Sequence, residues 1–200
     1  MTEMVTAVRA RGRPAATLIP HLDLLTDVLF VVAGTALVAG AAQISISLPF
    51  TPVPITGQTF AVLLVGAALG TIRGCASLLL YLLVGIAGAP VYADHNHGWA
   101  VVTSASGGYL VGFVLAAAVT GFLAEHRWDR RFSSSISLML TGNVIVYLVG
   151  LPWLAVVLDT GLKKTLELGL YPFVPGDIFK LYLAAALLPT AWRVVRRRDA

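Results

Sequence analysis

Long apolar segments without charge alternate with short polar segments along this chain. No charged residue and no histidine occurs from Val28 to Ile72, from Gly98 to Ala124 or from Phe132 to Leu158. A helix needs about 20 mostly apolar residues to cross the hydrocarbon core of a bilayer, so each segment can hold at least one crossing. The pattern predicts an all-α, polytopic membrane protein.

We expect a bundle of six transmembrane helices. The apolar stretch that follows Thr59 is interrupted by Arg73 and Gly74, which predict a tight turn between two short helices. The expected transmembrane domain covers residues 24–194, with a basic tail on each side at residues 1–23 and 195–200. The six helices are expected at about residues 26–46, 59–72, 75–89, 106–124, 135–157 and 175–194.

A proline-rich loop should follow the first helix, in the stretch SLPFTPVPITGQ. Pro49, Pro52 and Pro54 each lack an amide donor and push the preceding residue towards extended geometry. Non-helical backbone survives at membrane depth only where protein buries it or water reaches it. We therefore expect this loop to cover the outer mouth of a cavity.

The composition and charge agree with a membrane protein: 58% of the 200 residues are hydrophobic and 12% are charged. The formal charge of +4 does not indicate nucleic-acid binding, because the basic residues follow the positive-inside rule. The rule predicts that both termini are cytoplasmic. Eleven of the 14 basic residues lie in the tails and two alternate loops: Arg9, Arg11, Arg13, Arg73, Arg127, Arg130, Arg131, Arg193, Arg196, Arg197 and Arg198.

Asp177 and Lys180 are the only full charges inside the long apolar stretches, and they are three residues apart at the start of the last one. A charge at mid-membrane is costly, so such a pair indicates a functional site. One helical turn separates them, which lets both side chains face one cavity. Gly176 allows close approach, and Phe173 supplies an apolar wall. The alternative is a structural ion pair that neutralises itself within the bundle.

The first predicted span carries small residues at helical spacing, in the pairs Thr35 with Ala39 and Ala36 with Gly40. Such faces let another helix approach closely, because apolar contact alone gives no driving force in lipid. They are candidates for a face that docks a partner subunit. The alternative is packing against other helices of the same bundle.

The remaining motifs, and the absence of others, argue against a metal site, a disulfide and a hydrolase. His95 and His97 form an HxH pair with only Asp94 nearby, which is a weak basis for a metal site, and Asn96 is the better candidate for a polar ligand. The single Cys75 excludes an intramolecular disulfide. No P-loop motif and no hydrolase motif is present, so a partner would have to supply energy for transport.

Four ordered motifs resemble a known family: ISISLPFTPVPITGQTFAVLLVG, SGGYLVGF, IVYLVGLPWLA and PFVPGDIFK. Over about residues 28–188 the chain is similar to BioY, the biotin-specific S component of energy-coupling factor transporters. The resemblance implies a six-helix bundle, without enzymatic activity or a cofactor, that captures biotin on the outer side of the cell membrane. It also implies partners, namely a transmembrane coupling subunit and two ATPases, with residues 35, 36, 39 and 40 in the docking face.

The resemblance also implies roles for the candidate site residues. Biotin has a carboxylate, for which Lys180 is the candidate cation, and ureido N–H groups, for which Asp177 is the candidate acceptor. Which charge takes which end of biotin stays open. The expected polar contacts are Thr56, Gln58, Asn96, Tyr109 and Tyr147, and the expected apolar lining is Phe50, Val53 and Phe173.

Three alternatives to this interpretation remain open at the level of sequence. The chain could bind another small carboxylated vitamin, or it could be a purely structural membrane subunit. It could also be an intramembrane enzyme that uses Asp177 as a general acid or base, although no second acid or histidine lies near Asp177 in the sequence.

Overall fold

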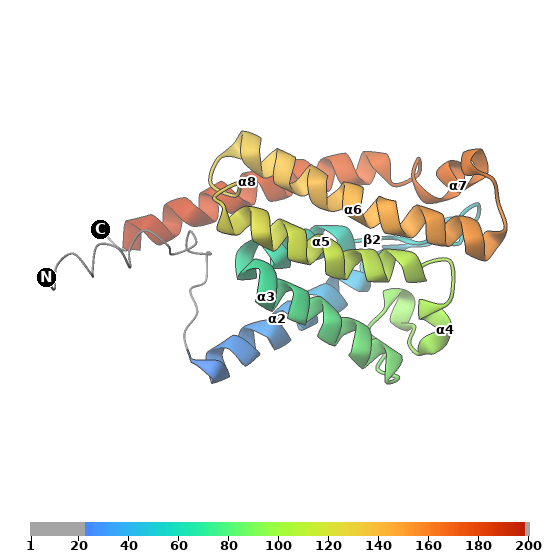
Figure 1. The fold of residues 1–200 in the computed structure, drawn as a ribbon, viewed down its shortest axis with the longest axis horizontal. Helices are drawn as coiled ribbons and strands as arrows, with labels where there is room; N and C mark the ends of the chain where they lie inside the picture. The colour runs from blue at the N-terminus through green and yellow to red at the C-terminus, as the bar shows by residue number, and fades with distance from the viewer. Residues whose placement is uncertain (1–22, 199–200) are drawn as a thin grey trace, which may run out of the picture.

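The computed structural model describes residues 23–198 of the chain, so the predicted basic tail at residues 1–23 lies outside the described residues except for its last residue. Helices dominate the described part (Figure 1). The longer helices are α2 (Leu24–Ala42), α3 (Gln58–Ile86), α5 (Gly107–Glu125), α6 (Phe132–Leu158) and α8 (Val174–Arg198). The short elements are β1 (Ser45–Ile46), β2 (Ile55–Thr56), η1 (Ala93–His95), α4 (Trp99–Val102) and α7 (Leu162–Gly169).

A sharp break divides α3 at Gly70, which has φ 84° and ψ −179°. Only glycine adopts this backbone conformation without strain. A Cβ atom built on Gly74 would lie 2.9 Å from the Cα of Gly66, whereas eight residues of straight helix span about 12 Å. The helix therefore folds back at Gly70. The Glu125 carboxylate accepts a hydrogen bond of 2.8 Å from the Thr71 amide and so caps the second half.

The break lies three residues before the predicted turn at Arg73 and Gly74, because the φ value that the fold-back requires falls on Gly70. By length and composition, α2, α3, α5 and α6 can each cross a membrane, and α7 with α8, bent by 53°, can form a fifth crossing. A count of six treats the two halves of α3 as separate spans, and that number stays a prediction.

The first predicted helix ends earlier than expected. α2 stops at Ala42, and Ser45 and Ile46 pair with Thr56 and Ile55 in a two-stranded antiparallel hairpin. The residues between the strands are non-helical and carry the three prolines, which cannot donate the amide hydrogen bonds of a helix. This hairpin, α4 and α7 lie at one end of the bundle, and the C-terminal end of α8 lies at the other (Figure 1).

Large apolar side chains remain exposed along the outside of the helices, as expected where lipid surrounds them. Leu29 on α2, Leu148 on α6 and Phe179 on α8 are examples. Lipid tails are as apolar as these side chains, so burying them inside the bundle gains nothing. The helices instead pack through small residues: a Cβ atom on Gly121 of α5 would lie 2.4 Å from the Gly70 carbonyl carbon.

The end of the bundle where α8 finishes contains an ion pair and a buried carboxylate. Arg73 is buried and pairs with Asp27 in the first turn of α2. Asp129, in the loop between α5 and α6, is fully buried and accepts a hydrogen bond from the indole of Trp192. The guanidinium of Arg130 lies 4.2 Å from the centre of the Trp192 ring. The ion pair joins α2 to α3, and the contacts of Trp192 join α8 to the loop between α5 and α6.

Candidate functional site

A cavity of about 510 Å³ lies at the end of the bundle that carries the β-hairpin, η1, α4 and α7 (Figure 1). Its walls come from the hairpin loop, from the segment between α3 and α5, from α5 and α6, and from the start of α8. Pockets for small molecules span about 300 to 1,000 Å³ and combine apolar walls with a few placed polar groups. The cavity therefore has the size and position of a small-molecule site.

Asp177 and Lys180 both line this cavity, as the sequence predicts, and they form an ion pair of 3.2 Å. Asp177 is buried, and its second oxygen accepts a hydrogen bond from the hydroxyl of Tyr147 on α6. The Lys180 ammonium also donates to the Thr59 hydroxyl on α3 over 2.9 Å. Groups from three helices thus meet at one polar centre.

The surroundings of Asp177 and Lys180 stabilise the two charges and leave one N–H donor of Lys180 for a ligand. Asp177 lies in the first turn of α8, where the helix dipole stabilises a negative charge. An ammonium has three N–H donors, and Lys180 uses two of them on Asp177 and Thr59. Among the described residues the third donor has no hydrogen-bond partner, and Lys180 lines the cavity, so this donor is available for a ligand.

A second polar wall begins at the N-terminal end of α3. The Thr56 hydroxyl donates to the Gln58 side-chain oxygen over 3.0 Å, and the Gln58 amide nitrogen donates to the Tyr81 hydroxyl over 2.8 Å. Tyr81 in turn donates to the Val91 carbonyl over 3.1 Å. The Gln58 side chain is thereby fixed in one orientation, with Thr56 and Gln58 both lining the cavity.

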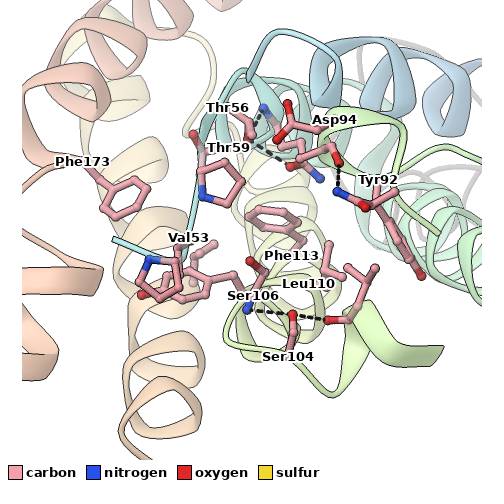
Figure 2. A pocket seen from close by; sticks show the side chains of 18 of the residues that line it. Val53, Thr56, Thr59, Tyr92, Asp94, Ser104, Ser106, Leu110, Phe113 and Phe173 are labelled. Atoms are coloured by element: carbon pink, nitrogen blue, oxygen red, sulfur yellow. Dashed lines mark hydrogen bonds between the residues drawn. The ribbon is translucent and has the colours of Figure 1, made fainter. Parts of the chain in front are cut away.

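Aromatic rings form the apolar wall. Tyr109 and Phe173 stack with ring centres 6.5 Å apart, and Tyr109 meets Tyr147 edge to face at 6.3 Å. The Tyr109 hydroxyl donates to the Gly169 carbonyl over 2.9 Å, which satisfies its polar end away from the ring. Figure 2 shows Phe173 across the pocket from Tyr92 and Asp94, with Phe113 between them. Such walls suit a flat apolar ring.

The proline-rich loop covers part of the cavity, with Pro52, Val53 and Pro54 among its lining residues. Hydrogen bonds hold the loop at both sides. The Thr51 hydroxyl donates to the Leu168 carbonyl over 2.7 Å, and the Ser47 hydroxyl donates to Asp94 over 3.1 Å. The loop is therefore attached to α7 on one side and to η1 on the other.

The structure brings most of the predicted site residues together. Phe50 and Gly176 are the exceptions, because neither lines the cavity. The Phe50 side chain is 60% exposed, and no atom of the described residues lies within 4 Å of the Cβ position of Gly176. Phe50 lies in the non-helical segment between β1 and β2, and the spacing of the prolines does not reveal which side chains of this segment face the cavity. The predicted residues that line the cavity are Val53, Thr56, Gln58, Asn96, Tyr109, Tyr147, Phe173, Asp177 and Lys180.

Sequence reasoning missed several lining residues. Thr59 is the most important, because it contacts both charges of the pair. Its position in the first turn of a helix next to the predicted loop is the only signal that could have found it. Further missed residues are Ser47, Thr51, Tyr92, Ser104, Ser106, Phe113 and Val146, while Asp94 and His97, considered for a metal, also line the cavity. Within residues 23–198, no group of three or more His, Cys, Asp or Glu side chains is placed to hold a metal ion.

The four small residues of α2 do not share one exposed face. Thr35 is buried and donates to the Ser77 carbonyl over 2.8 Å, and Ala39 packs against the core. These two residues serve packing inside the bundle, which corrects the expectation that all four are available to a partner. Ala36 and Gly40 are exposed, and within residues 23–198 no atom lies within 4 Å of the Cβ position of Gly40.

Comparisons with known proteins agree on one family. The model of the BioY family matches residues 10–197. A biotin transporter BioY from Rhizobium etli is 36% identical over 172 residues, which cover 82% of this chain and 90% of that protein. A biotin transporter BioY from Thermotoga maritima is 37% identical over 153 residues, which cover 76% and 88%.

The fold also matches a solved structure, the S-component for biotin from an ECF-type ABC transporter, with a TM-score of 0.78. The match covers 86% of this chain and 95% of that chain, at 24% sequence identity. At this identity the likeness establishes the fold alone.

Proposed function

Because the chain belongs to the BioY family, we propose that it is the biotin-binding S component of an ECF-type vitamin transporter. It is a multi-pass membrane protein that binds and delivers its ligand and is not an enzyme. The observation that carries this proposal is the ion pair of the buried Asp177 with the half-buried Lys180, which lines a cavity of about 510 Å³ at one end of the bundle.

The chemistry of the cavity complements biotin. The ureido ring of biotin has N–H donors and a carbonyl acceptor, the thioether ring fused to it is apolar, and the valeryl chain ends in a carboxylate. Asp177 can accept the ureido N–H groups, and the free donor of Lys180 can meet the ureido oxygen or the carboxylate. Tyr109 and Phe173 provide the apolar wall for the thioether ring.

The arginines gather at one end of the bundle and the cavity lies at the other, and this difference supports an orientation in the membrane. Five arginines lie towards the end of the bundle opposite the cavity: Arg73 just after the break in α3, Arg127, Arg130 and Arg131 in the loop between α5 and α6, and Arg193 in the last part of α8. By the positive-inside rule this end faces the cytoplasm, as do both termini, and the cavity opens to the outside of the plasma membrane. The protein would therefore capture biotin from the external medium.

Partner subunits must drive uptake under this proposal, since the sequence contains no nucleotide-binding P-loop. A transmembrane coupling subunit with two ATPases would supply the energy. We assign its docking face to the exposed side of α2 around Ala36 and Gly40, where small side chains allow close approach of another helix.

A thermal-shift measurement tests the ligand. Purified protein in detergent is heated with and without biotin, and in parallel with other small carboxylated vitamins such as pantothenate, nicotinate and lipoate. A ligand at 100 times its dissociation constant should add about 2.7 kcal/mol to the free energy of unfolding. We expect a clear rise in Tm with biotin alone. A rise with a different vitamin and none with biotin would overturn the assigned ligand while keeping the architecture.

A further inference from the structure

The side chain of Gln43 connects the end of α2 to the loop that precedes α4. Gln43 is the C-terminal cap residue of α2, and its amide nitrogen lies 3.1 Å from the Ala39 carbonyl oxygen of its own helix. The same nitrogen lies 3.4 Å from the Val91 carbonyl oxygen and 3.1 Å from that of Tyr92. One side chain therefore joins two segments that are 48 residues apart in the sequence.

The oxygen of the Gln43 side chain is also engaged. It accepts a hydrogen bond of 3.1 Å from the backbone amide of His95. An amide group is the side chain that can donate to carbonyls with one atom and accept from a backbone N–H with the other. Gln43 uses both atoms on the same loop, so it fixes the position of the loop and its direction.

This loop contains two consecutive residues in a strained conformation. Asp94 has φ 56° and His95 has φ 59°, in the left-handed region that side chains other than glycine rarely occupy. Such conformations persist only where the surrounding structure holds them. The bond from His95 to Gln43 is made within the strained turn itself, so its loss would allow the turn to relax.

Residues in and beside the strained turn line the cavity. Tyr92, Asp94 and Asn96 all line it, whereas Gln43 and His95 do not. The loop behaves as one unit, because the Tyr92 amide donates to the Asn96 carbonyl over 3.1 Å and the Asn96 side chain donates to the Ala93 carbonyl over 2.9 Å. A shift of the turn would therefore move Asn96 relative to the ligand.

We propose that Gln43 is a positioning residue for ligand binding, which acts from outside the cavity by holding the strained Asp94–His95 turn so that Asn96 faces the ligand. This inference rests on the proposed function, since biotin is the ligand whose affinity it sets. Because Gln43 restrains the loop through hydrogen bonds to Tyr92 and His95, its loss should lower the affinity for biotin.

A double-mutant cycle with biotin tests the proposal. Gln43→Met keeps the length of the side chain but removes both polar atoms, and Asn96→Ala removes the group that Gln43 positions. We expect Gln43→Met to weaken biotin binding by about tenfold in the wild-type background and by less than about twofold in the Asn96→Ala background. Ile44→Ala, at the exposed neighbouring position, is the matched control and should leave the affinity unchanged.

Two further readouts separate positioning from a general structural role. Hydrogen exchange of residues 91–97 in ligand-free Gln43→Met should be faster than in the wild type, while exchange in α5 and α6 stays the same. If Gln43→Met does not give monodisperse protein, Gln43→Asn, which keeps the amide on a shorter side chain, takes its place with the same expected loss.

The same measurements tell failure of the role proposed for Gln43 apart from failure of the proposed biotin-binding function. An unchanged affinity in the folded Gln43 variant, or an equal loss with and without Asn96, would overturn the inference alone. A wild-type protein that is folded and binds no biotin would overturn the proposed function and this inference with it.

Discussion

The Lys180 ammonium on α8 donates a hydrogen bond of 2.9 Å to the Thr59 hydroxyl on α3. The same hydroxyl lies 3.4 Å from Asp177, so Thr59 contacts both members of the buried ion pair. Lysine is a flexible side chain, and this contact fixes the direction of its charge within the cavity. The helix that carries the charges and the helix that orients them come from opposite halves of the sequence.

Replacing Thr59 tests this relationship. Thr59→Val keeps the shape of the side chain and removes the hydroxyl, which leaves Lys180 without its partner on α3. We expect biotin to bind about five- to tenfold more weakly, in line with the value of a hydrogen bond to a charged group. Thr59→Ser retains the hydroxyl and should bind within about twofold of the wild type. Isothermal titration of the two variants measures both values, and equal losses would contradict the role of the hydroxyl.

Replacing each of the two phenylalanines predicted to line the site should change biotin affinity to a different extent. Phe173 stacks on Tyr109 inside the cavity, whereas the side chain of Phe50 is 60% exposed and lies outside it. Phe173→Ala should weaken biotin binding by about tenfold or more, because it removes a buried aromatic wall. Phe50→Ala should have no measurable effect on the dissociation constant. A reversed order would show that the hairpin loop closes over the ligand in another arrangement.

Sequence reasoning located the ion pair because the bilayer makes intramembrane charge rare. Asp177 and Lys180 were identifiable without any structure, and so were the non-helical prolines beside the cavity. The fold-back in α3 was also expected, but its position was not. Arg73 and Gly74 look like the turn in the sequence, yet the conformation that reverses the chain belongs to Gly70, which is one of several glycines in an apolar run.

The burial or role of a residue could not be predicted from the sequence where contacts with distant parts of the chain decide it. Thr35 and Ala36 are neighbours in the same small-residue pattern, and only packing against α3 decides that the first is buried and the second is exposed. Gln43 looks like an ordinary polar residue at a helix end. Its role emerges only when the loop 48 residues later is seen to fold against it.

The exposed side of α2 should be needed for transport and not for binding. Ala36→Trp adds a bulky side chain to the proposed docking face, where it would block close approach of a partner helix. We expect energy-dependent biotin uptake by cells that contain the coupling subunits to fall by about tenfold or more, with biotin affinity of the purified protein unchanged. Leu187→Trp, at an exposed position on α8, is the matched control. Normal uptake with Ala36→Trp would exclude this face.

Asp129 should make stability depend on pH. Burial raises the pKa of this carboxyl above its usual value of 3.8, despite the hydrogen bond from Trp192. A raised pKa in the folded state means that the stabilising contribution is complete below about pH 4 and is lost as pH rises through the folded-state pKa.

Asp129→Asn removes this titration while keeping an acceptor for Trp192. We expect the Tm of the variant, relative to that of the wild type, to increase between pH 4.5 and pH 7.5. Thermal unfolding of both proteins at the two pH values measures the difference. A constant difference across this range would show that the buried carboxyl does not change its protonation there.

Equilibrium binding of radiolabelled biotin to the purified wild-type protein and to Asp177→Asn and Lys180→Ala measures whether the ion pair binds biotin. Asp177 is buried with Lys180 and Tyr147 as partners, so each substitution removes a charge that the ligand is proposed to contact. We expect saturable binding to the wild type and a loss of about tenfold or more in each variant, with both variants folded and monodisperse. Unchanged affinity in both variants would contradict a role of the ion pair in biotin binding.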